Sequence, residues 1–510
     1  MSKLNGSLRK AFRGVIVTPK TLQETTLIAD GAVLLGADGI ISHVLDMSAP
    51  GAEALLQEVD EVVDKRGCFI MPGFVDGHAH APQYAWTGTG MDLPLLEWLE
   101  TYTFPGESRF KDLSHARKVY ERSVRRHLRA GTTTCSYFGT LHLEATKLLV
   151  DIVREAGQRA YVGKVSMDRN SPEYYVEDTE EGLKAAEEFV QWCQEGVQSD
   201  ASVAATKAER DQSTSSYGSD HTSCESSEGD SDVFIDNSLV TPVVTPRFVP
   251  SCTPEMLRGL GSLATRYRLP VQSHLGETLP EIAWVRDLHP ESATYTHVYD
   301  DHGLLPSRED PESRPPIAYM AHCCHCCQDE RALLSDSSTG VVHCPSSNIM
   351  LGSGILSVRR MLADGVKVGL GTDVAGGYSP SILDALRQAI IASKTVMAAE
   401  EGNLDNIMDA RVREGVEHNP NGVEALSVSE AYYLATMGGA ECLGLQDTVG
   451  SFEPGKTFDA LVVDLEVEDS PVCVFPHDTH WDSFNKFIFN GDDRNIVEVH
   501  VGGRRVVSKN

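Results

Sequence analysis

Four segments of the sequence place histidine or aspartate directly after short runs of apolar or small residues. His78 and His80 close the run "PGFVDGHAH", and a β-strand would point both imidazoles to the same side. His274 follows "LPVQS", His322 follows "IAYMA" and Asp373 follows "VKVGLGT". Imidazole nitrogens and carboxylate oxygens are common zinc ligands. A His-x-His pair alone is as often a pair of core residues as a pair of ligands, but the four segments together predict a metal site.

His322 also opens a dense stretch of histidine and cysteine, "MAHCCHCCQDE", Met320 to Glu330. Structural zinc sites usually separate paired ligands by two to four residues and add a second pair further along the chain. Adjacent cysteines cannot easily turn four side chains onto one tetrahedral ion, and this argues against a zinc cluster formed by the stretch. We therefore expect His322 to face the metal site, and the residues from Cys323 to Cys327 to lead into a loop and helix as ordinary buried or half-buried thiols.

The elements that must position these side chains follow a repeating theme of a buried strand and then a helical stretch. Continuous apolar strands that alternate with helices indicate a parallel sheet covered on both faces. Eight such units predict an α/β fold with a (β/α)8 barrel, in which functional side chains lie at the carboxyl ends of the strands. The eight runs are "CFIMPGFVDGHAH", "AGTTTCSYF", "RAYVGKVSMD", "PVVTPRFV", "LPVQSHLGE", "IAYMAHC", "GVVHCPSSN" and "VKVGLGTD".

The two ends of the chain have a different pattern from the middle. "GAVLLGADGIISHVL" near the N-terminus and "IVEVHVGGRRVV" near the C-terminus read as short strands joined by turns. We expect both ends to pair into one small β-sandwich domain. Residues 1–70 would form its N-terminal part, residues 71–425 the barrel, and residues 426–510 the last helices and the C-terminal part of the sandwich.

One segment interrupts the barrel pattern. The stretch of residues 199–232 is rich in Ser, Thr, Asp and Glu and nearly free of large apolar side chains. Such a composition cannot bury enough surface to offset the entropy of ordering the chain. It predicts a disordered surface insertion, which we expect to be dispensable for the fold.

Composition excludes several classes of function. The chain of 510 residues has 44 basic and 74 acidic side chains and a formal charge of −30. This balance opposes binding to nucleic acids or to anionic membranes, because contacts with phosphate need clusters of Lys and Arg. No segment is long and apolar enough to span a bilayer, and the dispersed cysteines and the absence of a secretory signal predict a cytoplasmic protein with reduced thiols.

The order of the metal-binding segments resembles that of the amidohydrolase superfamily, which consists of metal-dependent hydrolases on a (β/α)8 barrel. Further stretches resemble the guanine-deaminating members of that superfamily: "HAPQY", "TPRF", "SHLGE", "HCPSSNIMLGSG" and "LGTDVAGGYSPSILDALR". The resemblance runs from about Asn5 to Val507, apart from the acidic insertion and shorter elaborations. In one place it departs, since the chain has Ala-His-Cys at Cys323 where Ala-His-Gly is typical.

The resemblance implies hydrolysis of guanine to xanthine and ammonia, a step of purine breakdown, with one Zn²⁺ per chain and a water that completes the metal site. The implied metal ligands are His78, His80, His274 and Asp373. No lysine or second carboxylate is placed to bridge a second ion. Zinc lowers the pKa of a coordinated water to about 7.

Three residues have implied catalytic roles. Glu277, in "SHLGE", would carry protons between the water, ring atom N3 and the leaving amine. His322 would orient the water or stabilise developing charge, and Asp373 would accept a proton from the water while it binds the metal. The alternative for Glu277 is a helix-capping or surface glutamate.

The resemblance also implies how the purine is bound. Arg247 would donate to the O6 carbonyl, Phe248 would flank the ring, and Gln83 would offer both a donor and an acceptor. The alternative for Arg247 is a salt bridge at the barrel rim. Other residues expected to border the substrate are His80, His274, Glu277 and Asp373.

Two other functions stay open from the sequence. One is a related hydrolase that acts on another cyclic amidine or on a triazine, for which Arg247 would lack a carbonyl partner. The other is a catalytically inactive relative that serves as a scaffold, although such a protein would be expected to lose its metal ligands. The resemblance implies a homodimer.

Overall fold

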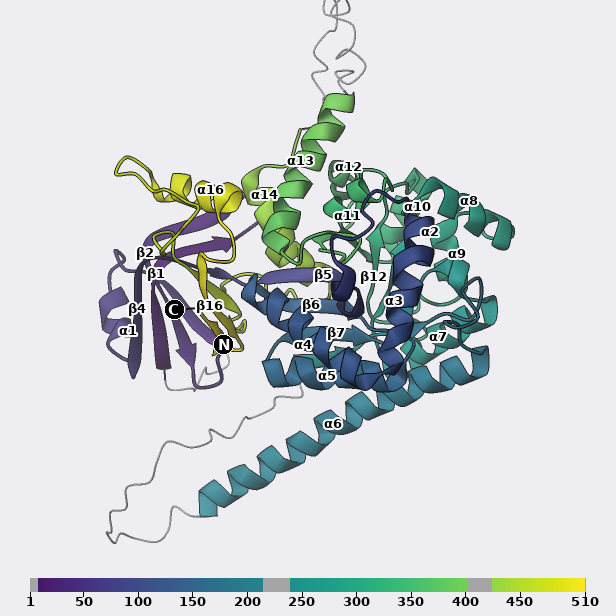
Figure 1. The fold of residues 1–510 in the computed structure, drawn as a ribbon. Helices are drawn as coiled ribbons and strands as arrows, with labels where there is room; N and C mark the ends of the chain where they lie inside the picture. Colours follow the sequence, from purple (N-terminus) through teal and green to yellow (C-terminus); the bar gives the residue numbers. More distant parts are fainter. Residues whose placement is uncertain (1–7, 214–238, 401–423, 510) are drawn as a thin grey trace, which may run out of the picture.

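A seven-stranded sheet stands beside a barrel of parallel strands in the computed structural model, which describes residues 8–213, 239–400 and 424–509 (Figure 1). The order of the sheet is β17-β16-β15-β4-β1-β2-β3, so strands from both ends of the chain pair with one another. The predicted small β domain built from both ends is therefore confirmed. Its strands are β1 (Leu8–Pro19), β2 (Thr25–Gly36), β3 (Ile41–Asp46), β4 (Glu61–Pro72), β15 (Ala460–Val463), β16 (Ile496–Val501) and β17 (Arg504–Ser508).

The barrel contains the eight predicted strands in the predicted order. Two four-stranded parallel sheets, β5-β6-β7-β9 and β11-β12-β13-β14, form its two halves. The strands are β5 (Phe74–His80), β6 (Thr132–Phe138), β7 (Arg159–Gly163) continued by β8 (Val165–Ser166), β9 (Val240–Pro242) continued by β10 (Thr245–Pro246), β11 (Val271–Leu275), β12 (Ala318–His322), β13 (Gly340–His343) and β14 (Val368–Leu370). Every residue of β5 and β6 is buried, as expected for parallel strands covered on both faces.

Backbone hydrogen bonds join the two halves on both sides. Val244 bridges in parallel to Val271, and beyond β14 the amide of Asp373 donates to the carbonyl of His78 over 2.8 Å. The buried carboxylate of Asp76 strengthens the second seam, since it accepts the amide of Thr372 at 3.0 Å, the hydroxyl of Thr372 at 2.6 Å and the amide of His78 at 3.2 Å. Asp76 thus ties the first barrel strand to the segment after the last one.

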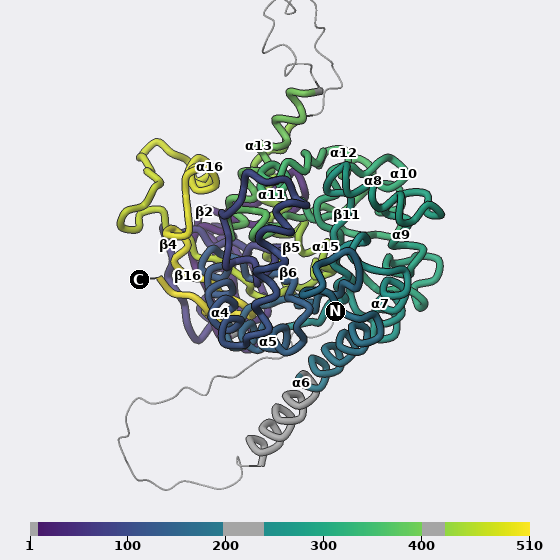
Figure 2. Tube along the Cα trace, turned by 45° about the vertical axis from the view of Figure 1, so that its right-hand side comes forward, coloured from purple at the N-terminus to yellow at the C-terminus, as the bar shows by residue number. Residues whose placement is uncertain are grey.

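Helices cover the outside of the barrel (Figures 1 and 2). Local signals fix where they begin: Asp112 accepts the amide of Ser114 at the start of α4, and Thr278 and Glu281 form a capping box at the start of α8. The helices of the barrel are α4 (Leu113–Arg129), α5 (Leu143–Ala156), α6 (Thr179–Ser213), α7 (Pro254–Tyr267), α8 (Leu279–Leu288), α9 (Tyr295–Asp301), α10 (Gln328–Asp336), α11 (Pro345–Met350), α12 (Val358–Ala363) and α13 (Ile382–Glu400). Helices α14 (Val428–Tyr433), α15 (Gly439–Cys442) and α16 (His480–Asn490) follow, and α1 (Ala52–Leu56) belongs to the sheet end.

The prediction of a disordered insertion over residues 199–232 is wrong for its first part. Helix α6 continues without a break to Ser213 and projects beyond the barrel (Figure 1). Composition did not predict this helix, although alanine and long charged residues such as those in "AATKAER" have a high helix propensity. Residues 214–232 of the predicted insertion lie outside the described residues.

A short helical segment over the barrel mouth separates β5 from α4. It contains η1 (Ala81–Trp86), α2 (Leu95–Trp98), η2 (Leu99–Thr103), α3 (Phe104–Ser108) and η3 (Arg109–Lys111). Its apolar side chains Leu95, Trp98, Leu99 and Phe104 pack together with Leu351 in a cluster of their own. Among the described helices, none has the length and apolar character that crossing a membrane requires.

Asp76 gives a test of the barrel seam. Asp76→Ala should lower the free energy of unfolding by about 3 kcal/mol, because the buried amides of Thr372 and His78 lose their acceptor. Asp76→Asn keeps one oxygen for those amides and should cost about 1 kcal/mol. Urea denaturation of both variants and the parent measures the difference. An equal loss in the two variants would mean that the oxygen acceptor does not stabilise the seam.

Candidate metal centre and active site

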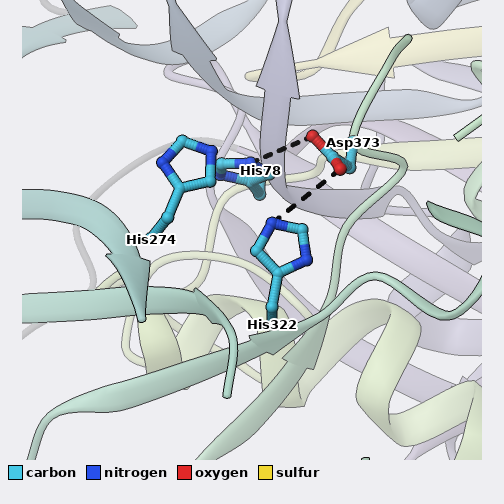
Figure 3. Close-up of side chains that lie close together, drawn as sticks. All are labelled: His78, His274, His322 and Asp373. Carbon is cyan, nitrogen blue, oxygen red and sulfur yellow. Dashed lines mark ion pairs between the residues drawn. The ribbon is translucent and has the colours of Figure 1, made fainter. Parts of the chain in front are cut away.

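Three histidines and one aspartate from four barrel segments form a compact group in the barrel mouth (Figure 3). Ligand atoms of His78, His274, His322 and Asp373 all lie within 4.8 Å of one another. The Nε2 atom of His78 is 3.2 Å from Oδ1 of Asp373, and Nε2 of His322 is 3.8 Å from Oδ2. Convergence of four strand ends at one mouth follows from the parallel barrel, as the sequence predicts.

His80 lies at the edge of the same group. Its Nε2 atom is 3.2 Å from Nε2 of His274 and 3.5 Å from Oδ1 of Asp373. The tightest group therefore differs by one histidine from the predicted ligand set, because it contains His322 where the prediction has His80. All five side chains surround one small volume.

Hydrogen bonds outside the group fix how two of the imidazoles face it. Nδ1 of His274 is 2.6 Å from the carbonyl oxygen of Arg247, and Nδ1 of His322 is 2.8 Å from Oδ1 of Asn348. Both partners are acceptors, so each Nδ1 carries the hydrogen, and each Nε2 presents a lone pair to the group when the ring is neutral.

Burial sets the charge of the group. It lowers the pKa of His78, His80 and His274 below the ordinary value, so these imidazoles are neutral at neutral pH. Burial alone would raise the pKa of Asp373, but the imidazoles that face its carboxylate, with His78 at 3.2 Å first among them and His322 next, lower that pKa well below its usual range. The group thus offers neutral imidazole nitrogens and an ionised carboxylate, the forms in which these side chains bind a metal.

The donor set fits a zinc ion. The buried Nε2 atoms of His78 and His322 have no hydrogen-bond partner among the described residues, and neither has Nδ1 of His80. Buried polar atoms are rarely left without a partner, so these nitrogens indicate a missing one. Histidine nitrogens with one carboxylate suit Zn²⁺ better than the oxygen-rich sites of Mg²⁺ or Ca²⁺.

Glu277 reaches the same volume from the turn after β11. Gly276 has a φ of 54°, a left-handed conformation that glycine adopts without strain, and this turn follows His274 directly. Oε1 of Glu277 accepts the hydroxyl of Ser353 at 2.8 Å, and Oε2 is 3.5 Å from Nε2 of His322. Burial raises the pKa of Glu277 to about 7, so both protonation states are accessible near neutral pH.

The charge of Glu277 is matched by that of His322. Burial alone would lower the pKa of His322, but the carboxylates of Glu277 and Asp373 outweigh it and raise the pKa. The two groups therefore stabilise each other's charged forms across 3.5 Å.

A pocket opens beside the group. All of the residues predicted to contact substrate line it, together with apolar side chains from the mouth segment. The lining residues are His80, Gln83, Leu95, Trp98, Leu99, Arg247, Phe248, His274, Glu277, His322, Leu351, Asp373 and Gly376. The polar side chains of the predicted site thus share one pocket.

Behind this pocket lies Glu107, a residue that the sequence did not predict as part of the site. It is fully buried in α3 and forms a two-pronged salt bridge with Arg247 through oxygen–nitrogen distances of 2.7 and 3.1 Å. The alternative considered for Arg247, a salt bridge, is therefore present, but in the interior and not at the rim. A glutamate within "TFPGESRF" gave a weak signal, because nothing in the sequence pairs it with a residue 140 positions away.

The dense cysteine stretch contributes its histidine to the site and not its thiols. Neither group of potential metal ligands in the described part of the chain includes a residue from Cys323 to Cys327. Cys323 is buried with its Sγ 3.8 Å from the carbonyl oxygens of Met320 and Ala321, and Cys327 begins helix α10 as its N-cap. Cys323 has a φ of 53°, which explains why glycine suits this position in the resemblance.

A protein-family model described as the amidohydrolase family matches residues 69–506 of the chain. Among curated proteins, the chain is 39% identical over 517 residues to guanine deaminase of Dictyostelium discoideum, with 99% of this chain and 100% of that protein covered. It is 38% identical to guanine deaminase of Homo sapiens, with 91% of this chain and 92% of that protein covered. Among solved structures, guanine deaminase from C. acetobutylicum with bound guanine in the active site matches at a TM-score of 0.77 and 34% identity, covering 97% of this chain and 99% of that one.

Two variants separate the possible ligand sets. His80→Ala should lose most of its metal, because Nε2 of His80 lies near both His274 and Asp373. His322→Ala should keep metal after dialysis, because its nearest carboxylate is Glu277 and not Asp373. Elemental analysis measures the metal content of both variants and of the parent. Metal that is lost in His322→Ala and kept in His80→Ala would make His322 the ligand in place of His80.

Replacing the cysteines tests the stretch from Cys323 to Cys327. A variant with Cys323→Gly and serine at Cys324, Cys326 and Cys327 should bind as much metal as the parent, because these thiols do not face the site. Glycine at the first position also keeps the left-handed backbone. A folded variant that binds no metal would show that the thiols are ligands.

Proposed function

Because the chain belongs to the amidohydrolase family, we propose that it is a zinc-dependent hydrolase that converts guanine and water to xanthine and ammonia. The observation that carries this proposal is the shared pocket. One wall has the metal-binding group and an acid with a pKa of about 7, and another has Arg247 and Gln83. Full-length similarity to guanine deaminases supports the choice of substrate.

One zinc ion per chain would be held by His78, His80, His274 and Asp373. When bound, zinc acts as a Lewis acid and makes water nucleophilic near neutral pH. His322 stays outside this set and faces Glu277. The described site has no lysine or additional carboxylate between the ligands to bridge a second ion.

Glu277 moves the protons. Addition of water at C2 of guanine requires a proton on ring atom N3, and loss of the amine requires another proton on nitrogen. A carboxyl group with a pKa of about 7 can take a proton from water and deliver it to each of these atoms in turn. Ser353 holds the carboxyl by a 2.8 Å hydrogen bond, so the same group can face the water and the ring.

His322 and Asp373 prepare the attack. His322 donates through Nδ1 to Asn348, which fixes the ring, and its Nε2 faces the volume between Glu277 and Asp373. There it can bind the attacking water or stabilise negative charge on oxygen. Asp373 remains ionised and can accept a hydrogen bond from the water.

The opposite wall would bind the purine. Arg247 and Gln83 direct polar groups to the pocket, while Phe248, Leu99 and Trp98 supply apolar surface for the ring faces. A triazine without a ring carbonyl would leave the N–H groups of Arg247 that Glu107 does not bind without an acceptor, which favours guanine over that alternative. A scaffold without activity would not need to keep all the proposed ligands together with Glu277.

We further propose that the protein is a cytoplasmic homodimer, as the resemblance of its sequence implies. Exposed apolar side chains on α13 and α16, namely Ile391, Trp481 and Phe489, are compatible with a contact between subunits.

Turnover of guanine tests the proposal, and Glu277→Gln tests the mechanism. The parent should release xanthine and ammonia in equal amounts. The glutamine variant should keep its zinc but lose about 10²–10⁴-fold or more in kcat, because an amide cannot carry the proton. KM should change less, since Arg247 and Gln83 are unaltered.

Ammonia release and zinc content are measured on the same samples. A parent with zinc but without guanine turnover would reject the proposed substrate. A zinc-replete variant within about tenfold of the parent kcat would assign the proton transfer to another group.

A further inference from the structure

We propose that Glu107 is a positioning residue that turns Arg247 and Gln83 into a wall of hydrogen-bond donors, so that the pocket selects purines with a carbonyl at C6. This inference rests on the proposed function for the orientation of the purine. Glu107 does not line the pocket, whereas Arg247 and Gln83 do. It therefore acts through its neighbours.

Four hydrogen bonds saturate the carboxylate of Glu107. Oε1 accepts from Nε2 of Gln83 at 2.9 Å and from Nη2 of Arg247 at 3.1 Å. Oε2 accepts from Nη1 of Arg247 and from the hydroxyl of Tyr175, both at 2.7 Å. The partners follow three different barrel strands, so this one carboxylate in α3 joins three segments of the barrel mouth.

The partners of Gln83 determine which way its amide faces. A carboxylate can only accept, so the nitrogen of Gln83 must face Glu107. The oxygen of the amide accepts the backbone N–H of Ala375 at 3.2 Å. The second N–H of the amide and one lone pair of its oxygen remain for the pocket. Glu107 thus fixes the direction in which Gln83 offers a donor to substrate, and Ala375 uses part of its acceptor capacity.

Arg247 is held in the same way. Its two terminal nitrogens each give one N–H to Glu107, and the guanidinium lies 5.3 Å from the centre of the Phe104 ring. A guanidinium has five N–H groups and no acceptor, so the groups that remain are donors. Bidentate pairing also fixes the plane in which they point.

Charge explains why a neutral base fits. Arg247 and Glu107 are 3% and 0% exposed, and together they add no net charge to the wall. A buried guanidinium without its partner would favour an anion, because an uncompensated charge is costly in the interior. With Glu107 in place, the wall attracts the lone pairs of a carbonyl oxygen and a ring nitrogen on a neutral purine.

The consequence is selection at C6. A carbonyl oxygen there accepts from the donor wall, whereas a hydrogen at C6 leaves buried N–H groups without a partner. Sites built to pair with a substrate group reject analogues that lack it much more strongly than apolar pockets reject a missing methylene. The other described carboxylates that line the pocket, Glu277 and Asp373, lie with the histidines of the metal-binding group.

Equilibrium binding of hypoxanthine and purine tests the inference without turnover. Both lack the amino group at C2, and they differ by the carbonyl at C6 and the hydrogen on N1 that accompanies it. Titration calorimetry on the zinc-loaded parent should show tighter binding of hypoxanthine. In Glu107→Gln the ratio of the two Kd values should fall by about tenfold or more, mainly because hypoxanthine binds more weakly.

Tyr175→Phe is the matched control. It removes one hydrogen bond from Glu107 but keeps the charge and both contacts to the wall, so the ratio should stay within about threefold of the parent. A loosened pocket without a positioning effect would weaken both ligands alike and leave the ratio unchanged. That outcome in Glu107→Gln would overturn the inference.

A second variant keeps the test decisive if Glu107→Gln does not fold. Glu107→Asp keeps the charge but shortens the side chain, so it cannot hold Gln83 and both nitrogens of Arg247 together, and its ratio should also fall. If Glu107→Gln does not fold, this variant decides in the same way. Failure of guanine turnover in the parent would reject the proposed substrate and not the positioning effect, because the Kd ratio does not depend on catalysis.

Discussion

Neutral imidazoles surround one ionised carboxylate in the buried mouth of the barrel, and the other features of the site depend on that electrostatic arrangement. An ionised Asp373 is 6% exposed, and three of the histidines near it have pKa values lowered by burial. A buried negative charge among neutral groups is costly unless a cation or hydrogen bonds compensate it. A divalent cation would remove that cost, and the buried Nε2 atom of His78, which has no hydrogen-bond partner among the described residues, belongs to the same group as Asp373.

Two glutamates on different sides of the pocket show how neighbours decide the role of a carboxyl group. Glu107 is paired with a guanidinium and two further donors, so it has no free oxygen lone pair directed to a substrate. Glu277 has one hydroxyl donor and a histidine at 3.5 Å, and its pKa is raised to about 7. The first carboxylate is fixed as a structural partner, whereas the second can exchange a proton.

Much of this arrangement could be predicted from the sequence, because strand ends in a parallel barrel converge whatever their separation along the chain. The pattern of apolar runs predicted eight strands, and the polar residues at their ends led to the five side chains of the group, His78, His80, His274, His322 and Asp373. Pairs of side chains from segments far apart in the sequence could not be predicted in this way, because no local pattern links the two partners. Glu107 lies far from Arg247 in the sequence, and only the fold shows that they form a buried pair.

Local composition was the least reliable guide. The polar stretch from residue 199 predicted disorder, yet α6 continues through Ser213, since helix propensity does not require an apolar face. The cysteines after His322 attract attention by their density, but the backbone directs that histidine alone to the metal group. Composition thus indicated neither the length of α6 nor the direction of His322, because both depend on backbone geometry.

Metal titration tests the central claim most directly. Protein stripped by a chelator should be inactive toward guanine, and activity should return in proportion to added Zn²⁺ until about one equivalent per chain, as a site with four protein ligands requires. The break in that curve, measured with the concentration of folded chain known, gives the stoichiometry. Full activity in the stripped protein, or a break at two equivalents, would contradict a single metal held by this group.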